Sequence, residues 1–416
     1  MSNMDIKELQ AISDAAINEA NAVLREINLS LHSNPEIMYQ EHHAHKILTD
    51  LLEERGFDVE RGAFGISTAF RASYGSTSGG GRTASVNLEY DALRDIGHAC
   101  GHNLIATAGL AAVLGVAAAI KRGEIKGRIV AFGTPAEEGG GGKIKMLRAG
   151  AFEGMACSLM VHPMSARSSH NNAYSSSMCG SELTIEYTGK PAHAMAAPWD
   201  GINALDAVTL LHTSVGLLRQ QIMPTDRIRG VVLSTGQQSA VIPEKAVARY
   251  CVRSASLERY RVLKQKFVNC MDAAALATGC TVKATWLPAY WDIRTNDHLA
   301  ARYMHHVQRA DPDQQFRSVE EQKRCPDCYS TDQGNVTYAV PSIHPTFMIH
   351  SPDGAVHTRE FTAAAATDDA HRRTVDQGKA MAAVALEVLV DDAFAAQVQA
   401  QYDAMDLSVA KDPFVQ

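Results

Sequence analysis

The chain has 416 residues, of which 46% are hydrophobic and 20% charged, and its formal net charge at pH 7 is −7. This composition is typical of a soluble globular protein. The length suggests two or three domains of about 100–200 residues each. The negative charge argues against nucleic acid or an anionic membrane as a partner, because either would require a basic surface.

The stretch over residues 1–28 is polar and helical in pattern, and it lacks the basic start and apolar core of a secretory signal. Apart from Cys325 and Cys328, the eight cysteines are scattered, and a chain of this size needs no disulfides for stability. We therefore expect reduced thiols and a cytoplasmic protein. The Cys325 and Cys328 pair has no second pair at zinc spacing, so a structural role is favoured over a redox or zinc role.

The first part of the chain alternates helices and strands. Apolar spacing predicts one or two helices over Asp5–Ser33. Further expected helices are Glu41–Arg55, Leu104–Ile120 and Lys143–Ala149, and expected strands are Phe57–Glu60, Ser67–Tyr74, Val86–Glu89, Arg128–Gly133 and Ser158–Val161. This alternation predicts an α/β fold with a mostly parallel sheet flanked by helices. The uncharged run Leu104–Ile120 is a little short of the roughly 20 residues that span a bilayer, so we expect a buried helix and no membrane span.

From Ser181 the pattern changes to that of an inserted α+β domain. Its expected elements are strand 182–188, helix 203–220, strands 229–235 and 246–254, helix 257–278 and strand 280–286. This β-α-β-β-α-β order is typical of a ferredoxin-like domain. We therefore expect a catalytic domain in two parts, 1–180 and 295–416, around an inserted lid at 181–294. The last part should contain helices 297–309 and 362–390 and short strands 337–341 and 346–349.

A turn directly after the strand at Val86 carries three potential metal ligands, His98, Cys100 and His102. Cys100 and His102 are two residues apart, so in an extended turn they project to the same side. A thiolate beside an imidazole favours zinc or a similar ion over magnesium or calcium. From this stretch alone, a buried cysteine between two structural histidines is an equally good interpretation.

Several reactive side chains follow predicted strand ends, namely Cys100, His102, Glu137, Glu138 and His162. In open α/β sheets ligands bind at the carboxyl ends of strands, so we expect these residues to share one site. Glu137 and Glu138 are adjacent and should point in opposed directions, so that one can ligate a metal while the other reaches a bound water. Together with His357, four of these residues offer the five N, O and S ligands that two metals sharing a thiolate would use.

His193 follows the first strand of the predicted lid, away from these ligands in sequence. Two interpretations stay open for it. It is either a plain surface histidine or a residue that faces the substrate after domain closure.

Short motifs along nearly the whole chain resemble those of the di-zinc aminoacylase/carboxypeptidase metallopeptidases. The resemblance is strongest to their amidohydrolase branch, which includes aminobenzoyl-glutamate hydrolase, hippurate hydrolase and the β-alanyl-lysine dipeptidase type. The matching segments, in family order, are 32–36 with Glu41, 89–93, 98–103, 135–139, 161–163, 189–193, 201–206, 330–336, 342–345 and 357–361. Each motif is modest, but the ordered set is highly specific.

The resemblance implies a role for each matching residue. Cys100 bridges two divalent metal ions, with zinc favoured and manganese or cobalt as alternatives, and His102, Glu138, His162 and His357 complete the ligand set. Glu137 is the general base and acid, and His193 of one subunit of a homodimer steadies the substrate carbonyl in the site of the other. Asp91 and His98 support the ligands, whereas Asn203, Arg253, Ser330 and Thr331 contact the substrate. Glu89 and Asp91 stand where many relatives have His-x-Asp, so position 89 is not expected to be a ligand.

The expected reaction is hydrolysis of the amide bond of a small N-acyl amino acid or dipeptide by a metal-activated water. One alternative is a non-catalytic binding protein on the same fold, which the intact Glu137 and complete ligand set disfavour. The other is a relative repurposed for condensation or tailoring of a specialised metabolite, which would retain the same ligands. The sequence does not identify the preferred acyl group or amine.

Overall fold

The computed structural model describes residues 4–165, 170–324, 329–351, 354–412 and 414. The chain divides into two compact units. The first unit comprises Met1–Ser176, Ile293–Asp327 and Asp332–Met405, and the second comprises Ser177–Asp292, Cys328–Thr331 and Asp406–Gln416. The second unit overlaps the predicted insertion at 181–294 and adds two short later segments.

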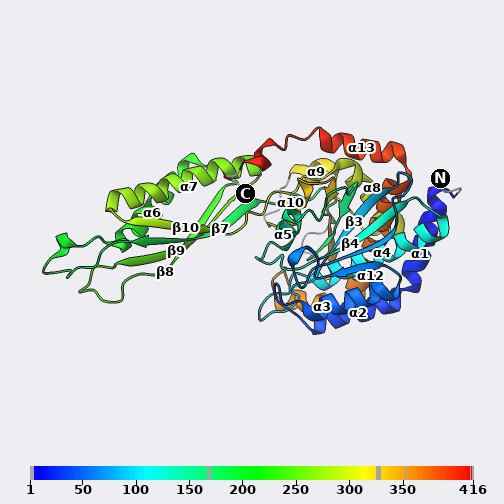
Figure 1. The fold of residues 1–416 in the computed structure, drawn as a ribbon, viewed down its shortest axis with the longest axis horizontal. Coiled ribbons are helices and arrows are strands. Elements are labelled where there is room, and N and C mark those ends of the chain that lie inside the picture. The colour runs from blue at the N-terminus through cyan, green and yellow to red at the C-terminus, as the bar shows by residue number, and fades with distance from the viewer. Residues whose placement is uncertain (1–3, 166–169, 325–328, 352–353, 413, 415–416) are drawn as a thin grey trace. The chain divides into compact units, whose positions relative to one another are not determined.

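The first unit contains a six-stranded sheet in the order β1-β2-β4-β3-β5-β11. Figure 1 labels two of its central strands, β3 and β4. The strands are β1 (Asp58–Arg61), β2 (Phe70–Ser76), β3 (Arg82–Glu89), β4 (Gly127–Thr134), β5 (Cys157–Leu159) and β11 (Ser342–Ile343). The pairings β4-β3, β3-β5 and β5-β11 are parallel, whereas β1-β2 and β2-β4 are antiparallel. The prediction of a mostly parallel sheet is confirmed, with an antiparallel edge.

Helices cover both faces of this sheet. Successive residues of a strand point to opposite faces, so each central strand can contribute to two cores. In β4, Ile129 and Ala131 belong to one hydrophobic core, whereas Val130 and Phe132 belong to another. The first core includes residues of α1 (Ile6–Glu19), α2 (Asn21–Ser33), α3 (His42–Glu54), α4 (His102–Gly123), α8 (Asp297–Ala310), α12 (Asp368–Val390) and α13 (Asp392–Asp403). The second includes residues of α5 (Gly142–Arg148) and α10 (Gln333–Thr337).

Helix α4 is the central helix of the first unit and is long and apolar enough to cross a membrane by length and composition. Its most apolar window is 94% buried inside the protein, which agrees with the expected buried helix. Its small residues allow close packing. A Cβ at Gly109 would lie 2.9 Å from Leu88 Cδ1, so glycine at this position lets the helix approach β3.

A two-stranded parallel ribbon lies outside the main sheet and pairs β6 (His162–Ser165) with β12 (Thr346–Ile349). The strand expected to run through Val161 therefore ends at Leu159, and His162 begins a new strand. Two short helices, α9 (Val319–Arg324) and α11 (Arg359–Ala364), complete the unit.

Two expectations for the C-terminal part were wrong. Residues 337–341 do not form a strand, because Thr337 ends α10 and its hydroxyl donates to the Gly334 carbonyl at 2.6 Å. The long helix expected over 362–390 is broken into α11 and α12. Thr367 causes the break, since its extended backbone and side chain cap α12 by accepting the N–H of Ala370.

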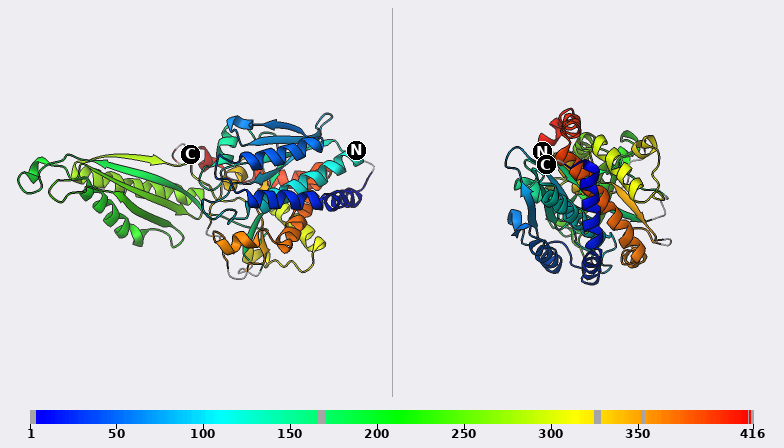
Figure 2. Two further views of the ribbon diagram at one scale, coloured as in Figure 1. Left: turned by 90° about the horizontal axis from the view of Figure 1, so that it is seen from below. Right: turned by 90° about the vertical axis from the view of Figure 1, so that its right-hand side faces the viewer.

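The second unit, drawn in green in Figure 2, contains an antiparallel sheet. Its four strands follow the order β10-β7-β9-β8. In chain order its elements are β7 (Cys179–Thr188), α6 (Ala204–Leu218), β8 (Arg227–Ser234), β9 (Lys245–Ser254), α7 (Leu257–Thr278) and β10 (Thr281–Trp286). The two helices pack against each other and against β9. The succession of strands and helices is the β-α-β-β-α-β order that the sequence predicts.

Candidate metal centre

The candidate site forms where β3 ends and the chain turns into α4. Leu93 and Gly97 exchange two backbone hydrogen bonds of 3.0 Å, which close the loop before the ligand turn. Gly101 has a φ of 78°, and a Cβ there would lie 2.5 Å from Pro163 Cγ, so glycine is required. The turn thus fixes Cys100 and places His102 at the first position of α4, against the segment that carries His162.

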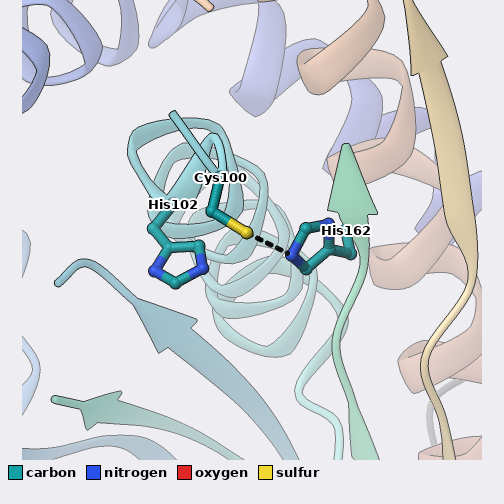
Figure 3. Close-up of side chains that lie close together, drawn as sticks. All are labelled: Cys100, His102 and His162. Carbon is teal, nitrogen blue, oxygen red and sulfur yellow. Dashed lines mark hydrogen bonds between the residues drawn. The ribbon is translucent and has the colours of Figure 1, made fainter. Parts of the chain in front are cut away.

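Three of the predicted ligands, Cys100, His102 and His162, form one compact group whose ligand atoms all lie within 4.8 Å of one another (Figure 3). The sulfur of Cys100 points toward the ring of His162, with 3.5 Å between Sγ and Nε2. The Nδ1 of His162 donates to the carbonyl of Pro163 at 2.8 Å. This bond fixes the tautomer and leaves the Nε2 lone pair facing the thiol.

Cys100 also belongs to a second group of possible ligands, with Glu138 and His357. Glu138 Oε1 lies 3.4 Å from His357 Nε2 and is among the buried oxygens of the described residues that make no hydrogen bond. His357 is tied to the ligand turn, because its N–H donates to the Ala99 carbonyl at 2.7 Å. The structure therefore brings the five predicted ligands together, with the one thiol common to both groups.

Glu137 lies beside its neighbour Glu138 but faces a third group, with Glu89 and His102. The two carboxylates belong to different groups of candidate ligands. Ala136, which precedes them, adopts a left-handed φ of 61°, and its N–H donates to buried Glu41 at 2.9 Å. Burial raises the pKa of the Glu137 carboxyl well above its usual range, and the charges of Glu89 and Glu138 add to this. Such a carboxyl is suited to carry a proton near neutral pH.

The two residues expected to support the ligands have different surroundings. Asp91 accepts from His102 Nδ1 at 3.2 Å and from the Glu138 N–H at 2.9 Å. Burial opposes ionisation of Asp91, but these hydrogen bonds and the charge of His102 outweigh it and lower its pKa. His98 is buried and stacks on His32 with 6.4 Å between ring centroids, and burial lowers its pKa to about 3.

Sequence reasoning missed a fully buried network of charges beside the ligands. Lys143, at the start of α5, donates through Nζ to Glu89 and, at 2.7 Å, to Asp332. Burial works against the charge of Lys143, but the carboxylates of Asp332 and Glu89 outweigh it and raise the pKa. A signal existed, since Lys143 follows four glycines at a strand end and Asp332 lies in the 330–336 motif.

The other predicted site residues lie in the second unit, so their approach to the metal ligands stays a prediction. The ring of His193 accepts the N–H of Met195 and of Ala196 at Nδ1. Asn203 caps α6 by accepting the Leu205 N–H at 3.0 Å, and the Ser330 hydroxyl donates to the Met178 carbonyl at 2.8 Å. Arg253 lies on β9, and Thr331 is buried. Cys325 and Cys328 lie outside the described residues.

A comparison with known proteins decides what kind of protein carries this site. Residues 84–405 match peptidase family M20/M25/M40. The chain belongs to this family. The resemblance inferred from the motifs is confirmed, and with it the expectation of a hydrolase that acts on amide bonds.

Relatives within the M20/M25/M40 family are similar over most of this chain. The Xaa-Arg dipeptidase of Mus musculus is 38% identical over 401 residues, which cover 93% of this chain and 90% of that protein. One polypeptide of the p-aminobenzoyl-glutamate hydrolase of Escherichia coli (strain K12) is 29% identical over 67% of this chain and 60% of its own length.

Solved structures share the fold of this family member. A putative aminohydrolase from methicillin-resistant Staphylococcus aureus has a TM-score of 0.74 at 18% identity and covers 91% of this chain and 100% of its own. A dinuclear metal-binding peptidase of the M20 family from Bacillus subtilis has a TM-score of 0.66 at 18% identity, covering 89% of this chain and 99% of its own.

Proposed function

We propose that this chain is a two-zinc dipeptidase that hydrolyses the amide bond of a dipeptide with a basic C-terminal residue. The observation that carries the proposal is the shared position of Cys100, whose sulfur lies in both groups of candidate ligands. The ligands would be Cys100, His102 and Glu138 together with His162 and His357.

The residues at the site fit such ions. The Nε2 of His102 and Oε1 of Glu138 are buried atoms without a hydrogen bond in the described part of the chain, as expected of atoms that bind a cation. Three imidazoles, a carboxylate and a thiol favour zinc over magnesium or calcium, and manganese or cobalt would be the alternatives. Burial raises the pKa of the Cys100 thiol, so that a thiolate at this place requires a bound cation.

The protein groups around the ligands have the properties that amide hydrolysis requires. When bound, the two ions would supply an activated water and polarise the substrate carbonyl. Glu137 would take a proton from the attacking water and pass it to the leaving amine, and general acid–base catalysis of this kind is worth roughly 10²–10⁴-fold. Burial and the neighbouring Glu89 and Glu138 keep its pKa raised, so that the carboxyl can hold a proton near neutral pH before it delivers it to the amine.

The proposed substrate class is supported by the mouse relative, which is named an Xaa-Arg dipeptidase and is similar over nine tenths of both chains. The bacterial p-aminobenzoyl-glutamate hydrolase polypeptide is less similar and covers less of this chain. We therefore place dipeptides ending in arginine or lysine first and N-acyl amino acids second.

A substrate panel would test this proposal. Protein stripped of metal with a chelator should be reloaded with zinc, manganese or cobalt and offered Xaa-Arg and Xaa-Lys dipeptides, p-aminobenzoyl-glutamate, and N-acetyl, hippuryl and indole-acetyl amino acids. The expected result is metal-dependent release of arginine or lysine. Equal turnover before and after chelation, or no hydrolysis of any substrate by metal-loaded protein, would contradict the proposal. Formation of amides from acid and amine in preference to hydrolysis would favour the synthetic alternative.

We further propose that the active unit is a homodimer formed through the second unit. Strand β8 is an edge of its sheet, and three consecutive apolar residues on it, Val231, Val232 and Leu233, are 59%, 51% and 47% exposed. An exposed apolar edge is a hazard unless another strand covers it, and pairing across a two-fold axis would do so.

His193 suits the role of a residue shared between subunits. Because Nδ1 accepts two backbone N–H groups, the neutral ring carries its proton on Nε2. The Nε2–H is then the group that would donate to a substrate carbonyl oxygen in the partner's site.

A further inference from the structure

Two buried atoms that both lack a hydrogen bond face each other beside the proposed ligands. Oε1 of Glu89 lies 3.3 Å from Nε2 of His102, and both side chains are fully buried. Neither atom makes a hydrogen bond within the described residues. A charge-assisted N–H···O bond would be shorter, at about 2.7–2.9 Å.

His102 is oriented by Asp91, which determines the ring nitrogen that faces Glu89. Its Nδ1 lies 3.2 Å from Oδ1 of Asp91, and since a carboxylate accepts, Nδ1 carries the proton. Nε2 is therefore the ring nitrogen left to bind a cation. A cation between Nε2 and the facing carboxylate oxygen, 3.3 Å away, would satisfy both atoms.

The separation of the two atoms is the one expected of two ligands on the same ion. With bonds of about 2.1 Å to a tetrahedral centre, two N or O ligands lie about 3.4 Å apart. Two pairs within the proposed ligand set have this spacing, Cys100 with His162 at 3.5 Å and Glu138 with His357 at 3.4 Å. The distance of 3.3 Å between Glu89 and His102 is close to these two ligand–ligand distances.

Glu89 is also held in one orientation. It is the last residue of β3, and its second oxygen accepts from Lys143 Nζ. Lys143 is in turn fixed by Asp332, which accepts its backbone N–H at 2.9 Å and its Nζ at 2.7 Å. This network leaves Oε1 directed at His102 and supplies a positive charge that offsets the additional carboxylate.

We propose that Glu89 is a sixth protein ligand and binds, through Oε1, the same ion as His102. This inference rests on the proposed two-metal function and deepens it. It reverses the expectation from the resemblance that position 89 is not a ligand. In this chain a carboxylate would take the place that a histidine holds in many relatives, with Lys143 as its counter-charge.

The test compares Glu89→Gln with Asp332→Asn in the full chain loaded with cobalt. Glu89→Gln removes the ligand charge at nearly constant shape, whereas Asp332→Asn removes the other carboxylate that holds Lys143. We expect Glu89→Gln to lower the affinity for one of the two ions by more than about 100-fold in chelator competition. It should also change the visible absorption bands of bound cobalt. Asp332→Asn should lower metal affinity by less, within the roughly 10–100-fold typical of residues that orient a ligand without binding the metal. The absorption bands of cobalt bound to this variant should match those of the wild type.

A second measurement does not depend on the folding of a variant. Anomalous diffraction from crystals of the wild-type protein grown with zinc should place an ion about 2.0–2.2 Å from Glu89 Oε1. An ion bound by His102 but well outside bonding distance of Glu89, or an unchanged cobalt spectrum in Glu89→Gln, would overturn the inference. The 3.3 Å contact between His102 and Glu89 would then be an ion pair and not a pair of ligands on one ion.

The two proposals fail in different ways. If wild-type protein binds no metal tightly, the two-metal function itself is wrong. If it binds two ions and hydrolyses dipeptides while Glu89→Gln retains both ions with wild-type affinity, only the assignment of Glu89 is wrong.

Discussion

Oδ1 of Asp91 lies 3.2 Å from Nδ1 of His102, so the carboxylate determines which ring nitrogen faces the metal site. Its other oxygen accepts the backbone N–H of Glu138 at 2.9 Å. One buried side chain thus orients two of the proposed ligands, one from each side of the site. Such outer partners contribute strongly to metal sites because they fix ligand orientation.

Replacement of Asp91 by asparagine should therefore weaken metal binding by roughly 10–100-fold and lower kcat, because the amide can donate to Nδ1 and reverse the tautomer of His102. Chelator competition measures the first effect. Asp95→Asn is a suitable control, since Asp95 lies in the same loop, is exposed, and has a φ of 68° that asparagine tolerates. Wild-type affinity in Asp91→Asn would contradict this role.

Glu137 and Glu138 should respond differently to the same change. Glu138→Gln should lose metal, because it alters a ligand. Glu137→Gln should retain metal and substrate binding but lose roughly 10²–10⁴-fold in kcat, because it removes only the proton carrier. Metal analysis together with steady-state kinetics separates the two. Loss of metal from Glu137→Gln instead would mean that the roles are exchanged.

Cys100→Ala should abolish activity and lower the metal content while the protein remains folded, since the thiol is common to both ligand groups. Metal analysis and circular dichroism of the purified variant would check this. Cys157→Ala is a matched control, because Cys157 is a buried free thiol on β5 outside these groups. Full activity of Cys100→Ala would exclude the bridging role.

The shared site can be tested by mixing two inactive variants. If His193 acts in the partner's site, exchange between His193→Ala and Glu137→Gln subunits gives heterodimers with one site made of intact parts. Random pairing and independent sites should then restore roughly a quarter of wild-type activity. Absence of recovery despite demonstrated exchange would mean that His193 acts in its own subunit or not at all. An active protein that is strictly monomeric by light scattering would also exclude the shared site.

Acid sensitivity should arise in part from His371 on α12. This ring is bound between Asn28, at 3.3 Å from Nδ1, and Asn21, at 3.1 Å from Nε2. Burial, with Arg25 nearby, lowers its pKa to about 4, below the value of about 6.5 expected in the unfolded chain. The unfolded state thus takes up the proton first, so the free energy of unfolding should fall as the pH drops from about 6.5 toward 4.

Denaturant unfolding at several pH values would measure this effect. In His371→Gln the decline between pH 6.5 and 4 should be shallower than in the wild type, because glutamine keeps polar atoms in place but does not titrate. An identical pH dependence in both proteins would rule out a contribution from His371.

The parts of the fold that sequence predicts well are those set by local periodicity. Helix α7 and strand β12 begin and end where the pattern indicates, and the ligands follow strand ends as a parallel sheet requires. The failures depend on contacts between distant segments. The apolar residues of 337–341 pack beside α10, which overrides their strand propensity. The periodicity around Lys143 does not reveal that Asp332 and Glu89 neutralise it, because the three residues meet only in the folded chain.

The position of the ligand turn between β3 and α4 has a consequence for the whole first unit. The proposed ligands come from segments far apart in sequence, between Cys100 and His357, so in the unfolded chain they would rarely meet. Ions held by them would act as removable cross-links that close long loops of the chain. The thermal stability of the first unit would then rise with the free metal concentration by mass action. Removal of the ions by a chelator would lower this stability and make the chain more susceptible to proteolysis.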